Sequence, residues 1–275
     1  MLAAAGSLVI TWALVRANTV GWGSFEVLAT LIAGAAAIVG FVVWERRAPS
    51  PMIPVELFRR RGFATANAVS FFMYAGLFGA LFLMTQLLQF ALGHSPLVAG
   101  VMLLPWTAAP GIVSPIAGGL ADRYGNRPFM TAGLALQTIG LGWIAAVASS
   151  GMSYLQLGLA LGVAGIGIGL VFPTVANAVL ASVPLPEAGV ASGTNSTMRE
   201  LGGVLGVAIL AAVFARRGIY SSPRVFIDGF TAALWVGVGL SALGTLAAAL
   251  SPGRSSPTRA PAVREPALAF AGEHG

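Results

Sequence analysis

The chain has 275 residues, of which 57% are hydrophobic and 9% are charged, whereas a soluble globular domain carries about 25% charged residues. A water-soluble core of this size cannot bury so much apolar side chain, so the composition predicts an all-α integral membrane protein with lipid as its main solvent. The formal charge of +6 comes from arginine alone. These arginines lie between apolar runs, where basic residues orient membrane helices, so nucleic-acid binding is not expected.

Apolar stretches follow one another along the chain at the length of membrane spans. A transmembrane helix needs about 20 mostly apolar residues, and about eight stretches reach or approach that length. In chain order they are 1–15, 25–44, 66–90, 97–120, 129–147, 154–180, a run ending at residue 215, and 230–250. The first is short, so the chain is expected to begin inside a span, as a fragment does.

The arginines also predict the orientation of these spans. If the loop after the second span lies in the cytoplasm, eleven arginines lie on the cytoplasmic side and four on the opposite side. The C-terminus is then cytoplasmic. Residues 48–62 contain three prolines and an apolar-basic stretch, which predicts a segment at the cytoplasmic interface. Residues 251–275 are rich in Pro, Ser and Ala, which predicts a disordered cytoplasmic tail.

The most specific local pattern is GGLADRYGNRP at residues 118–128, between the fourth and fifth predicted spans. Its glycines are expected to end one helix, Asp122 to cap or complement the start of a neighbouring helix, and the two arginines to hold the loop inside. The pattern resembles the signature loop of the major facilitator superfamily, which helps to lock and release the contact between two halves. It is carried here by Gly118, Asp122, Arg123, Gly125 and Arg127. An ordinary cytoplasmic turn is the alternative interpretation.

Three further stretches, 54–63, 100–118 and 196–208, resemble the fourteen-span drug:proton antiporters (EmrB/QacA type) of that superfamily. The resemblance implies that residues 1–47 are two linker helices, the first truncated, and that residues 63–250 are the C-terminal six-helix half. The N-terminal half would then be missing. The resemblance also implies proton-coupled efflux of small organic compounds across the plasma membrane. The implied partners are the lipid bilayer, the substrate, protons and the missing half.

Candidate substrate residues lie on the third predicted span, because transporters of this kind bind their substrates near the midplane. Side chains spaced by three or four residues share one helix face, and one amide lies beside that face. Aromatic rings with amides suit amphipathic or cationic organic molecules. Alternatively, the rings face lipid and the amides bond to a neighbouring helix. The residues are Tyr74, Phe78, Phe82, Thr85, Gln86 and Gln89.

The seventh predicted span adds Asn195 and Arg199 to these candidates. Its uncharged stretch, 201–215, rises about 22 Å, against a hydrocarbon core of about 30 Å. Completing the span therefore draws Arg199 and Glu200 to the inner edge of the bilayer or slightly within it. The alternative is an arginine that snorkels to the interface. No acidic residue is expected deep inside a span, so the proton-carrying acid is expected in the missing helices.

Three classes of function are compatible with a membrane protein of this kind. The leading hypothesis is a secondary active transporter, since no GxxxxGK[ST] loop for ATP is present. The second is a truncated, non-transporting protein that functions only with a partner half. The third, an enzyme, is not expected, because the sequence contains no HExxH, GxSxG or metal-ligand cluster and no cysteine. No cofactor and no metal are expected.

Overall fold

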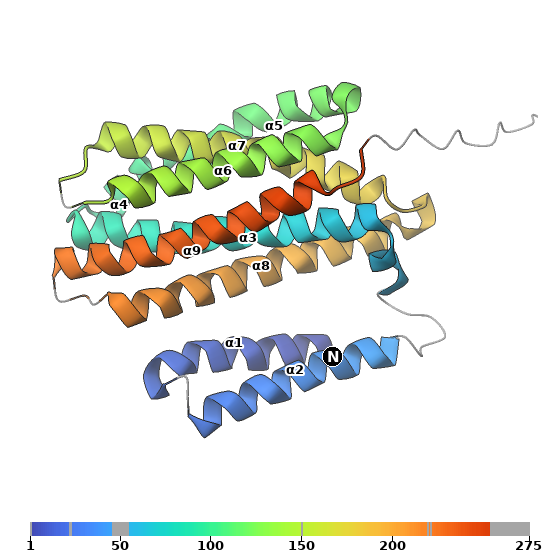
Figure 1. Ribbon diagram of the computed structural model, residues 1–275, viewed down its shortest axis with the longest axis horizontal. Coiled ribbons are helices and arrows are strands. Elements are labelled where there is room, and N and C mark those ends of the chain that lie inside the picture. The colour runs from blue at the N-terminus through green and yellow to red at the C-terminus, as the bar shows by residue number, and fades with distance from the viewer. Residues whose placement is uncertain are drawn as a thin grey trace, which may run out of the picture.

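The computed structural model describes residues 2–21, 24–45, 55–149, 151–218, 220 and 222–253. Within these ranges every regular element is a helix (Figure 1), so the predicted all-α fold is confirmed. The elements in chain order are α1 (Leu2–Val20), α2 (Phe25–Glu45), η1 (Val55–Arg59), α3 (Arg61–Gln86), η2 (Leu87–Ala91), α4 (Pro96–Met102), α5 (Leu104–Tyr124), α6 (Asn126–Val147), α7 (Tyr154–Leu180), η3 (Leu185–Glu187), α8 (Ala188–Arg217) and α9 (Pro223–Ala249). From residue 254 onward, the predicted tail lies outside the described residues.

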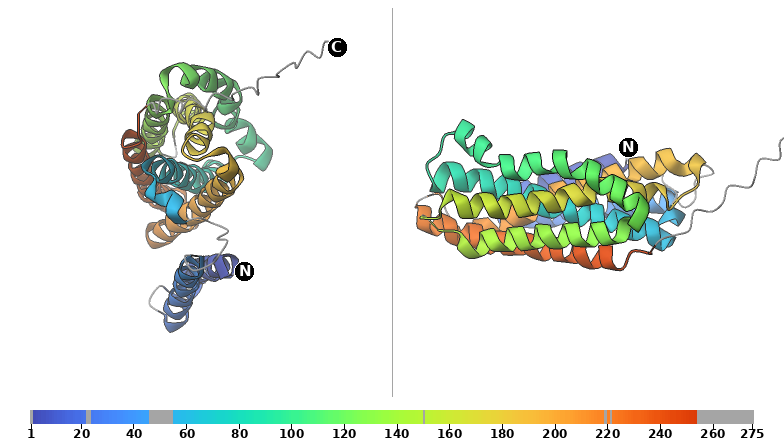
Figure 2. Two further views of the ribbon diagram at one scale, coloured as in Figure 1. Left: turned by 90° about the vertical axis from the view of Figure 1, so that its right-hand side faces the viewer. Right: turned by 90° about the horizontal axis from the view of Figure 1, so that it is seen from above.

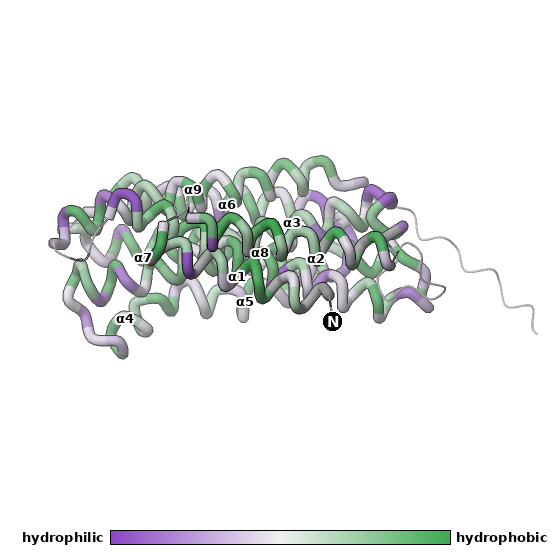
Figure 3. Tube along the Cα trace, turned by 90° about the horizontal axis from the view of Figure 1, so that it is seen from below, coloured by the Kyte–Doolittle hydropathy of each residue, from purple (hydrophilic) through white to green (hydrophobic). Residues whose placement is uncertain are grey.

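Six stretches in the described part of the chain are long and apolar enough to cross a membrane. They are Arg61–Ala91, Pro96–Tyr124, Asn126–Val147, Tyr154–Leu180, Leu185–Arg217 and Pro223–Ala249. Hydrophobic residues dominate the bundle, and hydrophilic ones gather at its two ends (Figure 3). The chain is therefore a multi-pass membrane protein, and these six stretches correspond to the last six of the predicted spans.

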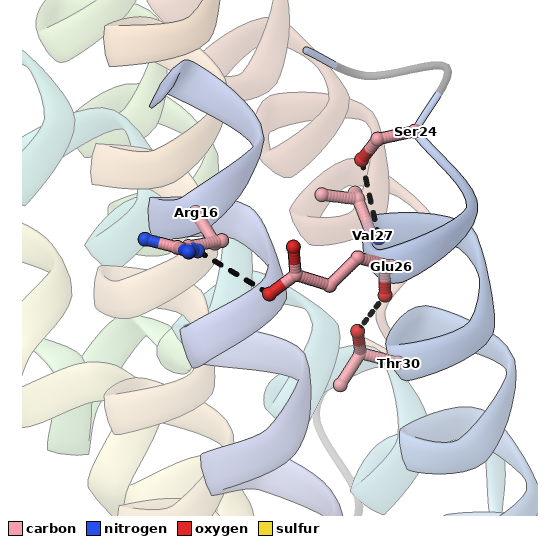
Figure 4. A network of polar contacts seen from close by, with 5 residues as sticks. All are labelled: Arg16, Ser24, Glu26, Val27 and Thr30. Atoms are coloured by element: carbon pink, nitrogen blue, oxygen red, sulfur yellow. Dashed lines mark hydrogen bonds and ion pairs between the residues drawn. The ribbon is translucent and has the colours of Figure 1, made fainter. Parts of the chain in front are cut away.

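Helices α1 and α2 form a separate hairpin beside the six-helix bundle (Figures 1 and 2), where α1 packs against α8. The carboxylate of Glu26 on α2 pairs with the guanidinium of Arg16 on α1 at 3.3 Å (Figure 4). The hydroxyl of Ser24 accepts a hydrogen bond from the backbone N–H of Val27 at 3.3 Å, which caps the start of α2. That these two helices are membrane-spanning linkers stays a prediction.

Serine and proline residues set the boundaries of several helices. Ser95, Ser153 and Ser222 cap α4, α7 and α9, each accepting a hydrogen bond from the backbone N–H three residues further on. The fourth predicted span is divided at Leu103 into α4 and α5. Pro105 lies in the first turn of α5, where its missing N–H costs nothing because the first turn has no intrahelical acceptor for it.

The bundle is held together by close contacts at small residues. α6 packs on α7 and α9, α3 packs on α8 and α9, and α5 packs on α7. A Cβ atom on Gly202 or Gly206 of α8 would collide with backbone carbonyls of α3, and Gly133 of α6 and Gly167 of α7 approach each other in the same way. Without a hydrophobic driving force in lipid, such close backbone approach supplies the van der Waals contact that joins membrane helices.

A buried polar contact lies at the middle of the six-helix bundle. Gln137, which has no exposed surface, donates from Nε2 to the carbonyl of Met73 and to the hydroxyl of Ser241, both at 3.2 Å. Helix α6 has 22 residues and is the shortest of the six spans, and its length of about 33 Å matches the hydrocarbon core of about 30 Å. Gln137 lies halfway along it. We call this depth, shared by α3, α6 and α9, the Gln137 level.

The two ends of the bundle differ in what they contain. At the end where α8 meets α9, an aromatic cluster of Phe90, Phe214, Tyr220 and Phe226 has ring centroids 4.9 to 5.5 Å apart, and burial raises the pKa of the Tyr220 hydroxyl. At the end where α5 meets α6, Arg60 pairs with Glu187 at 3.5 Å and donates to the carbonyl of Ser182. We call these the α8–α9 end and the α5–α6 end.

Candidate substrate site

The candidate site centres on Arg199 of α8 and Tyr74 of α3. The guanidinium carbon of Arg199 lies 5.6 Å from the centroid of the Tyr74 ring, within the range of a cation–π contact. Its Nη1 atom is 3.5 Å from the Tyr74 hydroxyl, a long hydrogen bond, and its Nη2 atom donates to the Ser196 hydroxyl at 3.0 Å. The Arg199 Nε atom is buried and has no hydrogen-bond partner.

Two further rings frame Tyr74. Phe78 of α3 stacks with Tyr74 at a centroid distance of 5.5 Å, and Phe172 of α7 meets Tyr74 edge-on at 5.9 Å. Phe78 keeps 42% of its surface exposed, and the α8 backbone beside it carries Gly203, whose added Cβ would lie 3.3 Å from the Phe78 ring. The site therefore offers ring faces from α3 and α7 and one cation from α8.

The depth of the site follows from its neighbours. Tyr74 is next to Met73, so it lies at the Gln137 level. Gly206 packs against Ala75, and Arg199 precedes Gly206 by seven residues, which places the Arg199 backbone about 8 Å from the Gln137 level toward the α5–α6 end. With the Gln137 level taken as the bilayer midplane, this position falls inside the hydrocarbon core, whose half-thickness is about 15 Å. That Arg199 and Glu200 lie at the inner edge of the bilayer or slightly within it stays a prediction.

The charge of Arg199 is not balanced by a carboxylate in the described part of the chain. The two ion pairs found there join Arg16 to Glu26 and Arg60 to Glu187. A charged group in the hydrocarbon core is costly and usually faces protein or a water-filled cavity. The guanidinium and the neighbouring rings together suit a ligand that presents a ring and a hydrogen-bond-accepting or anionic group.

Asn195 lies in a buried contact between α3 and α8. It is 5% exposed, and its Nδ2 atom donates to the Ser70 hydroxyl at 2.7 Å and to the side-chain Oδ1 of Asn67 at 3.2 Å. Hydrogen bonds of this kind join membrane helices. Its polar atoms are therefore engaged by α3, one turn of α8 before Arg199.

The remaining candidates of the third predicted span lie beyond this cluster. Phe82 is 37% exposed, and the Thr85 hydroxyl donates to the carbonyl of Phe82 in its own helix at 2.7 Å. The α-helix ends at Gln86, and the π-helical turn η2 (Leu87–Ala91) follows. Because a π-helix changes the number of residues per turn, the α-helical spacing that placed Gln89 on the Tyr74 face does not hold there.

The predicted signature loop is a one-residue turn. Gly118 and its neighbour Gly119 lie inside α5, which continues to Tyr124, so these two glycines of the pattern do not end the helix. Gly125 ends it instead, with a φ of 87°, a conformation that glycine adopts without steric cost. Gly125 also precedes α6 with no side-chain cap, so Asp122 does not cap that helix.

The charged residues of this turn gather at the α5–α6 end of the bundle. Asp122 and Arg123 lie on the last turn of α5, and Arg127 lies on the first turn of α6. All three are exposed. Gly125 is the single residue between the two helices, so Asp122 and Arg127 face solvent on either side of one sharp turn.

Two features of the site were not predicted. Phe172 comes from α7, and its only sequence signal is its position before Pro173 at the end of a glycine-rich run. Glu200 follows Arg199 on α8, about 6 Å from the Gln137 level, and is exposed. Helix α8 begins at Ala188, well before the uncharged stretch from which its depth was predicted.

Comparison with known proteins places the chain in a family. The family model described as Major Facilitator Superfamily matches residues 1–207 and, in a second placement, residues 66–272. Multidrug resistance protein Stp of Mycobacterium tuberculosis is 35% identical over 78% of this chain and 39% of that protein. The tetracenomycin C resistance and export protein of Streptomyces glaucescens is 32% identical over 76% of this chain and 38% of that protein.

The methylenomycin A resistance protein of Streptomyces coelicolor is 30% identical over 74% of this chain and 43% of its own length. The chain thus spans about two fifths of the length of these relatives. The family match covers nearly every residue of the chain and agrees with its six membrane-length helices. The chain belongs to the major facilitator superfamily.

Proposed function

We propose that the chain is the C-terminal portion of a fourteen-span drug:proton antiporter, a secondary transporter that exports small organic compounds across the plasma membrane. The relatives are named as resistance or export proteins, which supports the export of drug-like compounds. In this proposal an N-terminal half supplies the other wall of the transport path. The C-terminus lies in the cytoplasm, because that orientation puts eleven of the fifteen arginines inside.

The observation that supports a transport site is the guanidinium of Arg199. It lies inside the hydrocarbon core on the face of Tyr74, with a buried Nε atom that has no partner and with no carboxylate paired to it among the described residues. Intramembrane ionisable groups mark substrate or ion pathways. In our proposal the substrate's ring packs against Tyr74, Phe78 and Phe172, and its acceptor group bonds to Arg199.

Proton coupling is the finer part of the proposal. A coupled transporter needs a carboxylate or histidine that exchanges its proton within the membrane. In this proposal the acid lies in the helices of the N-terminal half.

Efflux by the complete protein, in cells that lack their own drug pumps, tests the site. The probes are ethidium, a cation, and fluorescein, an anion. We expect Tyr74→Leu and Phe172→Leu to slow efflux of the transported probe at least severalfold, because each removes a ring from the site. Trp143→Leu is the matched control, since Trp143 is an exposed ring on α6. Equal effects of all three substitutions would argue against the site, and no efflux by the unchanged protein would argue against the function.

A further inference from the structure

A hollow opens on the outer surface of the bundle where α6 and α9 pack together, far from Arg199 and Tyr74. Its volume is about 690 Å³. Its lining combines alanines, an indole ring and two opposite charges. These are Ala145 and Ala146 of α6, Ala232 and Trp235 of α9, and Arg217 and Asp228, and the lining is completed by Ala148, Ile227 and Thr231.

The depth of these side chains matches the layers of a lipid leaflet. Asp228 precedes Ser241 by thirteen residues, and Arg217 follows Gly206 by eleven, so both backbones lie about 20 Å from the Gln137 level. That is the headgroup layer, since the hydrocarbon core ends at about 15 Å and the whole bilayer at about 20–22 Å. Trp235 and Ala145 lie at about 9–12 Å, among the acyl chains. The two charges thus lie at headgroup depth, and the indole ring and Ala145 lie below them.

Arg217 and Asp228 share this rim without pairing. Both are exposed, and neither takes part in the ion pairs found among the described residues, whose limit is 4.0 Å. A guanidinium and a carboxylate that lie at one depth but apart from each other suit a ligand with two opposite charges. Trp235, 51% exposed, adds an aromatic surface at the depth of the acyl chains.

We infer that this hollow is a binding site for a phospholipid with a primary-ammonium headgroup, such as phosphatidylethanolamine. The phosphate accepts charge-assisted hydrogen bonds from Arg217, the ammonium donates to Asp228, and an acyl chain lies along the alanines beside Trp235. Phosphatidylcholine has no N–H to donate to the carboxylate. Phosphatidylglycerol brings only negative charge, which Asp228 repels. The site does not depend on the proposed transport function, because it shares no residue with the candidate substrate site.

Lipid retention by the full chain tests the inference. The protein is reconstituted into bilayers of equal amounts of phosphatidylethanolamine, phosphatidylcholine and phosphatidylglycerol, extracted mildly, and its retained lipids are quantified by mass spectrometry. We expect phosphatidylethanolamine to be enriched about tenfold over phosphatidylcholine, the ratio given by one hydrogen bond to a charged group. Asp228→Asn should abolish that preference, and Arg217→Gln should lower retention of both lipids.

Two variants complete the test. Arg224→Gln removes an exposed arginine of α9 that does not line the hollow, and it should leave the enrichment unchanged. Ala146→Trp fills the hollow at an exposed position while both charges remain, and it should displace the lipid. Equal retention of phosphatidylethanolamine and phosphatidylcholine by the unchanged protein, a preference for phosphatidylglycerol, or an unaltered preference in Asp228→Asn or Ala146→Trp would each overturn the inference.

Discussion

The guanidinium of Arg199 rests on the ring face of Tyr74, with 5.6 Å between the guanidinium carbon and the ring centroid. The contact joins two helices whose backbones already touch, since Gly202 and Gly206 of α8 pack against α3. A ring face stabilises a cation without neutralising it. Arg199 therefore keeps its attraction for an anionic or hydrogen-bond-accepting group within the membrane.

Arg199→Ala should impair transport in the complete protein more than Glu200→Ala does. Arg199 contacts Tyr74 and Ser196, whereas Glu200 is exposed on α8. Because a hydrogen bond to a charged group contributes about 1.5–3 kcal/mol, we expect a loss of about tenfold or more in efflux rate for Arg199→Ala. Initial efflux rates, normalised to protein in the membrane, measure both variants. Equal or reversed effects would contradict the placement of these two side chains.

Asp122→Asn should slow conformational cycling while leaving membrane insertion intact. Asp122 lies on the last turn of α5, where a negative charge opposes the helix dipole by about 0.3–1 kcal/mol. Its removal should therefore leave the fold as stable or slightly more stable. The rate of conformational change can be followed with a fluorescent label at the α5–α6 end. Unchanged transport kinetics would show that the segment is only a turn.

Gly206→Ala should destabilise the packing of α3 on α8. A Cβ at this position would collide with the carbonyl of Ala75, and overpacking of this kind costs about 1–3 kcal/mol. Gly193→Ala on the same helix is the control, because a Cβ there meets nothing within 4 Å. Thermal unfolding in detergent should show a lower midpoint for Gly206→Ala alone. A midpoint equal to that of the control would mean that α8 does not approach α3 this closely.

Asn195→Leu should weaken the bundle without changing which compounds are transported. The substitution removes the hydrogen bonds to Ser70 and Asn67, and each hydrogen bond between membrane helices contributes about 0.6–1.7 kcal/mol. The unfolding midpoint should fall, while the ratio of efflux rates for two probes should stay constant. A changed ratio would assign Asn195 to the substrate site, as its sequence position alone suggests.

The sequence predicts the membrane class and the last six spans, because a run of about 20 apolar residues in lipid can only be a helix. It also predicts three members of the cluster, Tyr74, Phe78 and Arg199, since aromatic spacing and an intramembrane charge are local patterns. Phe172 could not be found in this way. Its contact with Tyr74 arises from the packing of α7 on α3, which no local spacing encodes.

The extent of α8 was also beyond the sequence pattern. Residues 188–197 are small and polar and resemble a loop by hydropathy, yet they begin a helix of 30 residues. Their polarity serves helix packing, since Thr194 bonds to its own backbone and Asn195 bonds to α3. The same small residues that suggest a loop in water allow close contact between helices in lipid.

The contact between Gly133 and Gly167 is reciprocal, since a Cβ on either residue would meet the carbonyl oxygen of the other. A side chain added at one position cannot be accommodated by a smaller residue at the other. The added Cβ would collide with backbone atoms, which a substitution does not remove. Across homologues the two positions should therefore be constrained independently instead of co-varying as a large–small pair. A search for co-evolving residues would then miss one of the tightest contacts in the fold.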